Sequence, residues 1–153
     1  MSESTRIGDQ LRRSFEGGAW HGPAVQEVLA GVTAAKAAER PIPGGHSIWE
    51  IVLHITTWED VVRLRLEGDH FDNPPDEIDW PPVADGGGED AWRAALDGLK
   101  RANLALRDAI SRIDDARLEE IIPRKNYSVY YMLHGVIQHN LYHAGQIAIL
   151  KKG

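Results

Sequence analysis

A chain of 153 residues with 42% hydrophobic and 26% charged residues has the composition of one globular domain, which we expect to span residues 1–153. The chain has no cysteine, which excludes disulfides, thiolate metal sites and a cysteine nucleophile. Its net charge is −6 and its basic residues cluster only at the terminal Lys151-Lys152 pair, which argues against a nucleic-acid partner.

The first 15 residues are polar, and no later apolar run approaches the ~18 residues of a membrane span, so we expect a cytoplasmic protein without a membrane partner. Residues 5–15 are predicted to form a short helix that ends at Gly17-Gly18. Pro23 suits the first turn of a second helical run, and Thr33 could cap a further turn. The pattern leaves open whether one kinked helix or two helices cross the stretch from Gly17 to Pro23.

Residues 46–67 carry a strong helical pattern that ends at Gly68. Apolar residues recur three or four positions apart along one face. We place Trp58 on this face, where it flanks His54 and is a candidate to line the site. At ~100° per residue, His54 lies about 90° from the centre of that face and could turn inward. A second apolar line on this helix indicates a contact on another side, such as with a partner subunit, and consists of Trp49, Leu53 and Leu64.

Residues 68–88 are predicted to be a long connection, because four prolines and four glycines exclude a continuous helix. Its residues Asp72, Asp76 and Asp79 lack the spacing of an EF-hand loop, and we expect them to be solvated turn residues. Residues 89–113 then resume the helical rhythm, with Asn103 in the middle of the inward face. Asn103 could be a buried hydrogen-bonding residue, or it could line the same site as the histidines.

The last predicted helix, residues 128–150, is capped by Ser128 and has an inward face that is apolar at both ends but polar in the middle. The polar positions are His139, His143 and Gln146. The two histidines lie one helical turn apart, close enough to share a metal ion. Because burying them without partners would cost about 1–3 kcal/mol each, they are either hydrogen-bonded core histidines or metal ligands, and we favour a metal.

Four helical segments, one long connection and no strand pattern predict an all-α fold, a four-helix bundle with a long crossover connection between the second and third helices. His54, His139 and His143 each lie near the middle of a helix and should meet at one level. Three imidazoles would leave coordination positions open for a substrate, as in catalytic metal sites. The lack of a carboxylate on this face favours zinc, nickel or iron over calcium or magnesium.

Three segments, WHGP, HSIWEIVLHITTWE and HNLYHAGQI, resemble the DinB-like superfamily of metal-binding four-helix bundles, over residues 11–150. The resemblance implies a divalent metal ion, usually zinc or nickel, bound by His54, His139 and His143. It also implies activities such as thiol transfer with a low-molecular-weight thiol cosubstrate (bacillithiol or mycothiol), and it adds to the expectation of a homodimer. It does not imply DNA binding.

The other histidines are expected to be peripheral. His134 lies opposite His143 on the helical wheel and should face a neighbouring helix or solvent. His46 and His70 are expected at the surface. The resemblance places His21 near the mouth of the site, where it could touch a substrate.

The residues around the predicted site bear on its chemistry. Zinc proteases of the HExxH type have a glutamate after the first histidine; Asn140 occupies this position and argues against proteolysis. Glu50 and Gln146, each one turn from a predicted ligand, could orient ligands or relay a proton. We therefore expect a metal-dependent enzyme of the thiol S-transferase or hydrolase type that acts on a small molecule. The alternative is a non-catalytic metal- or ligand-binding module of a stress response.

Overall fold

The computed structural model describes residues 1–69, 72–83 and 87–153, and every regular element in this part of the chain is a helix. The elements in chain order are α1 (Glu3–Glu16), α2 (Val25–Leu29), α3 (Ala34–Ala38), α4 (Ile48–Glu67), α5 (Asp76–Asp79), α6 (Glu89–Ser111), the 3-10 helix η1 (Asp115–Glu119) and α7 (Val129–Leu150). The predicted all-α class is therefore confirmed for the described residues. None of the described helices combines the length and apolar character that a membrane span requires.

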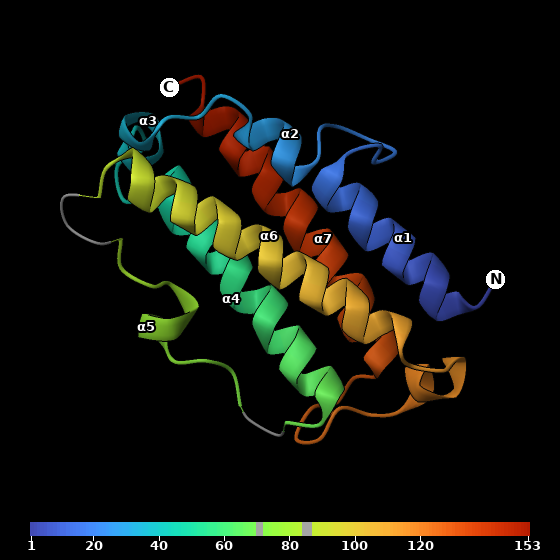
Figure 1. Ribbon diagram of the computed structural model, residues 1–153. Helices are drawn as coiled ribbons and strands as arrows, with labels where there is room; N and C mark the ends of the chain where they lie inside the picture. The colour runs from blue at the N-terminus through green and yellow to red at the C-terminus, as the bar shows by residue number, and fades with distance from the viewer. Residues whose placement is uncertain (70–71, 84–86) are drawn as a thin grey trace.

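The long helices α1, α4, α6 and α7 lie side by side as a bundle (Figure 1). Helices α1 and α4 each pack against both α6 and α7. The ends of α4 and α6 meet at one end of the bundle, where Arg112 approaches Glu67 at 3.5 Å. Helix α5, which comes between α4 and α6 in the chain, lies beside α4 (Figure 1).

Side-chain caps fix where several helices begin. Thr33 and Ser128 cap α3 and α7 by accepting hydrogen bonds from backbone N–H groups, as predicted. Ser47 and Glu50 form a capping box at the start of α4. Gly68 ends that helix with a φ of 108°, a left-handed conformation that favours glycine.

The stretch between α1 and α2 is a loop, so the two runs are separate helices. Helix α1 ends at Glu16, and Gly18 follows with a φ of 80°. The next helix begins at Val25, two residues later than the prediction from Pro23.

Apolar side chains form two buried clusters, one toward each end of the bundle. One cluster joins α2 and α3 to the first half of α4, and the other joins α1 to the second half of α4. Trp49 belongs to the first cluster: it is 3% exposed, and its ring centre lies 5.2 Å from that of Trp92 on α6. Trp49, the first residue of the second apolar line on α4, therefore packs inside its own chain. This residue gives no support to the predicted dimer.

A polar layer separates the two clusters. Glu59 of α4, Asn103 of α6 and Asn140 of α7 are each 0% exposed. Both asparagines donate to Oε1 of Glu59, Asn103 at 3.0 Å and Asn140 at 2.9 Å. The predicted inward face of α4 is therefore wrong at one position, since Glu59 lies on it and Trp58 is partly exposed at its edge. Asn103 has the buried hydrogen-bonding role, one of the two roles considered for it.

Candidate metal centre

Three histidine rings converge between α4 and α7. His54 extends from α4, and His139 and His143 extend from α7, the helix packed against it. Nε2 of His139 lies 3.0 Å from Nε2 of His54 and 3.1 Å from Nε2 of His143. The structure thus brings the three predicted ligands together, with donor atoms within 4.8 Å of one another.

In two of these histidines an acceptor holds the other ring nitrogen. Nδ1 of His54 lies 2.7 Å from the backbone carbonyl oxygen of Asp79 and 3.1 Å from its Oδ1. Nδ1 of His143 lies 2.6 Å from Oε1 of Gln146, so the predicted role of Gln146 in orienting a ligand matches its position. Because these oxygens can only accept, both Nδ1 atoms carry the hydrogen, and both Nε2 atoms present a lone pair to the centre.

The arrangement of the three Nε2 atoms is better explained by coordination of one metal ion than by hydrogen bonds among the imidazoles. Nε2 of His139 can donate one hydrogen at most, so it cannot satisfy the lone pairs of His54 and His143 together. Zinc–nitrogen bonds of ~2.0–2.1 Å in tetrahedral geometry place two donor atoms about 3.3 Å apart. The two separations that involve His139, 3.0 and 3.1 Å, are close to this value, and the all-imidazole donor set fits a divalent transition-metal ion.

Burial keeps these imidazoles in the form that binds metal. Desolvation, followed by the neighbouring His143 and His54, lowers the pKa of His139 to about 3. Desolvation also lowers the pKa of His143 to about 4, although the hydrogen bond to Gln146 acts in the opposite direction. The pKa of His54 is likewise lowered by burial, with Asp79 opposing. All three rings are consequently neutral near pH 7, as metal ligands must be.

The connection between α4 and α6 forms one wall of the site. The ring of Trp80 stacks on His54 at 3.8 Å and on His46 at 3.5 Å, so it lies between two imidazoles. Trp58 donates from Nε1 to Oδ1 of Asp79 at 2.6 Å. Asp79 thus orients His54 and fixes Trp58, and the prediction that it is a solvated turn residue is wrong.

Several residues considered from the sequence lie away from the histidine cluster. Glu50 is used in the capping box of α4 and in an ion pair with Arg40. His21 is exposed in the loop between α1 and α2, and its ring contacts that of Trp20 at 6.3 Å. Neither contacts the three histidines in the described part of the chain. His70 lies outside the described residues.

Glu59 is a buried carboxyl that the apolar pattern of α4 does not single out. Burial raises the pKa of its carboxyl to about 7, although the hydrogen bonds from Asn103 and Asn140 act to lower it. Its Oε2 has no hydrogen-bond partner among the described residues. The spacing in the sequence is compatible with its burial, because Ile55, Glu59 and Val62 lie four and three residues apart, as on an inward helical face.

Comparison with known proteins places this bundle in a family. A family profile described as the DinB superfamily matches residues 19–147, which include all three histidines. The chain belongs to the DinB superfamily. The resemblance seen in the sequence is thereby confirmed.

A solved structure described as the conserved protein of locus from Enterococcus faecalis resembles this DinB-superfamily chain with a TM-score of 0.72. The similarity covers 99% of this chain and 96% of that one at 18% sequence identity, and it supports the fold. No curated protein matches the chain.

Removing the acceptor of His143 should weaken metal binding by this DinB-superfamily protein. In the Gln146→Ala variant, Nδ1 of His143 loses its partner, so the ring is less well oriented and less basic. Metal affinity should fall roughly 10–100-fold, the usual effect of losing such an outer partner. Competition with a chromophoric chelator measures this change. Gln138→Ala, at an exposed position on the same helix, should bind like the parent, and equal affinities for the two variants would contradict the role of Gln146.

Proposed function

We propose that this protein binds one divalent metal ion through Nε2 of His54, His139 and His143 and acts as a metal-dependent enzyme on a small molecule. The observation that carries the proposal is the convergence of three neutral Nε2 atoms, two of which have their tautomer set by Asp79 and Gln146. Zinc or nickel suits the all-imidazole donor set best, and iron is the third candidate. The fold class that we propose is the four-helix bundle with a crossover between its second and third long helices.

The reaction that we favour is thiol S-transfer. A bound ion would act as a Lewis acid, able to hold a thiol as its thiolate or to lower the pKa of water. Asp79 is occupied, since it accepts from His54 and Trp58. Glu59 is 0% exposed in the polar layer, with one oxygen bound by the two asparagines of that layer, and no contact joins it to the three histidines among the described residues. Hydrolysis benefits from a general base, whereas a metal-held thiol is already deprotonated. Because the chain has no cysteine, the thiol must be a low-molecular-weight cosubstrate.

Each side chain around the site then has a definite task. Asp79 and Gln146 hold the hydrogens on Nδ1 of their histidines and so keep Nε2 available. Trp80 covers one face of His54 and limits the access of water to it. Trp58 is fixed by Asp79 and lies 6.1 Å from the ring of His139, where it borders the space available to a substrate.

Metal analysis of protein purified without a histidine tag is the first test, and about one zinc or nickel per chain is expected. The loaded protein is then screened with low-molecular-weight thiols and electrophiles, and separately with esters and amides. Thiol-dependent turnover that disappears with a chelator is expected.

Stoichiometric metal without turnover across both panels would instead favour the non-catalytic binding module. The observation that favours this alternative is that Asp79, the carboxylate in contact with the site, already accepts from His54 and Trp58 and is not free to act as a general base. Cytoplasmic location and homodimerisation stay predictions, and the dimer now rests mainly on the family resemblance.

A further inference from the structure

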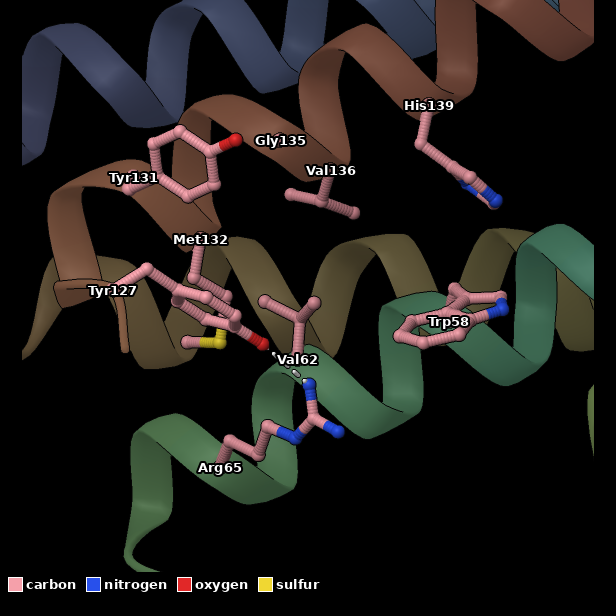
Figure 2. A pocket seen from close by; sticks show the side chains of 9 residues that line it. All are labelled: Trp58, Val62, Arg65, Tyr127, Tyr131, Met132, Gly135, Val136 and His139. Carbon is pink, nitrogen blue, oxygen red and sulfur yellow. Dashed lines mark hydrogen bonds between the residues drawn. The ribbon is translucent and has the colours of Figure 1, made fainter. Parts of the chain in front are cut away.

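A pocket of about 260 Å³ runs between α4 and α7 from the histidine cluster toward the start of α7 (Figure 2). His139 lies at one end, opposite Trp58, and Arg65 and Tyr127 lie at the other end (Figure 2). His139 and Tyr131 are eight residues apart on α7, so the pocket is about 12 Å long. An occupant could therefore reach the histidines at one end while the rest of it lay along the two helices.

The middle of the pocket is apolar and is open because of a glycine. Val62 of α4 and Val136 of α7 line it, with Gly135 between Val136 and the aromatic residues. A Cβ atom built on Gly135 would meet nothing within 4 Å. Glycine inside a helix is unfavourable relative to alanine. Because no neighbouring atom excludes a side chain at position 135, packing does not require a glycine there, and its effect is to keep the pocket open.

The far end of the pocket carries two polar side chains, Arg65 and Tyr127. Nη1 of Arg65 donates to the Tyr127 hydroxyl at 3.0 Å, and the guanidinium lies 5.8 Å from the centre of the Trp58 ring. Arg65 is only 4% exposed, and its Nη2 donates away from Tyr127, to Oδ1 of Asn73 at 3.1 Å and to the carbonyl oxygen of Asp72 at 3.4 Å. These contacts fix the guanidinium in the wall, where Nη1 polarises the Tyr127 hydroxyl. The Tyr127 oxygen accepts from Arg65 and can still donate its own hydrogen, for which there is no acceptor among the described residues. This end therefore suits a hydrogen-bond acceptor such as a carboxylate, because a hydroxyl that accepts from a guanidinium is a stronger donor.

We propose that this pocket binds the body of the substrate, an aryl-alkyl molecule whose carboxylate-like end meets Tyr127 and Arg65 and whose reacting end lies at His139. At ~30 Å³ per water-sized unit, the cavity holds on the order of ten heavy atoms, the size of a phenylpropanoate. Aromatic and apolar walls with a few placed polar groups are typical of small-molecule sites. The position of the reacting end rests on the proposed function, whereas the occupancy of the pocket does not.

The test uses 3-phenylpropanoate as the probe and protein freed of metal with a chelator, so that a carboxylate cannot bind an ion. A ligand-observed NMR titration should give saturable binding, and 3-phenylpropan-1-ol should bind more weakly. The Gly135→Leu variant fills the pocket, and its affinity should fall roughly tenfold or more. Tyr127→Phe removes one hydrogen bond to the carboxylate and should cost about three- to tenfold.

The matched control is Gly145→Leu. Gly145 is also a helical glycine of α7 whose added Cβ would meet nothing within 4 Å, but it does not line the pocket. Both leucine variants should fold, because leucine favours a helix more than glycine does, and thermal melting checks this. Equal binding by the two variants, or no saturable binding by the parent, would overturn the inference, and equal binding of the alcohol would overturn the anionic end. Metal content, measured separately on each protein, reports on the proposed function alone.

Discussion

Replacing His143 by alanine should empty the metal site while the bundle stays folded. Structural zinc sites with four ligands bind with roughly 10–16 kcal/mol, so one ligand contributes about 3 kcal/mol, or roughly a hundredfold in affinity. Among the described residues no fourth histidine or carboxylate joins the cluster to replace it. The bundle should survive, because its two apolar clusters do not depend on the imidazoles. The measurements are metal content and melting temperature of the parent and the variant, with and without added zinc or nickel.

The rise in melting temperature on adding metal distinguishes histidines that bind the ion from histidines that do not. An ion that binds the folded chain alone stabilises it by about 2.7 kcal/mol at a hundred times its Kd. The parent should therefore melt higher with metal, and the His143→Ala variant should lose most of this increment. His134→Ala is the control on the same helix, where the ring packs against Tyr130 rather than in the cluster. A variant lacking His134 that loses metal while one lacking His143 retains it would disprove the assignment.

Replacing Glu59 by glutamine should stabilise the protein at alkaline pH. The folded-state pKa of Glu59 is raised to about 7 from an ordinary value of 4.5, with burial as the main cause. The stability that its neutral form contributes is fully present below pH 4.5 and is lost as the pH rises to 7. At ~1.4 kcal/mol per pH unit, this costs on the order of 3 kcal/mol at pH 8 and under 1 kcal/mol at pH 5.

Glutamine removes this cost and adds donors that the polar layer can use. Its oxygen can accept from Asn103 and Asn140, and its amide can donate to one of their Oδ1 atoms, which have no hydrogen-bond partner among the described residues. A melting temperature higher by roughly 6–12 °C at pH 8 is expected, with a much smaller gain at pH 5. Asp60→Asn, at the neighbouring and less buried carboxylate, should change little at either pH. A large destabilisation by Glu59→Gln at pH 8 would mean that the carboxylate is ionised and paired in the folded protein.

Much of this site was predictable because its main features are local. His139 and His143 share a face through a four-residue spacing on one helix, and His54 lies near the middle of another. The caps at Thr33 and Ser128 depend on neighbours three residues away. Helical periodicity and short-range hydrogen bonds carry such features directly from sequence to structure.

The errors have two physical causes. Trp58 and Glu59 differ by one position, about 100° around the helix. Both keep a spacing of three or four residues from Ile55 and Val62, so periodicity does not choose between them, and hydrophobicity favours Trp58. That choice fails because Asn103 and Asn140 satisfy one oxygen of the buried carboxyl, a partnership between residues far apart in the chain. Asp79 was missed for a related reason, since its contact with His54 depends on where the connection docks.

The position of α5 would make the affinity of the proposed metal site adjustable from a segment that supplies none of the three histidines. That helix buries none of its own residues, so its docking depends on contacts such as those of Asp79 and Trp80 with His54. An ion that orders the His54 ring would favour docking of this segment, and by reciprocity docking of the segment would raise the affinity for the ion by that same coupling factor. Relatives could therefore diverge in their metal preference by drift in the connection while keeping all three histidines unchanged.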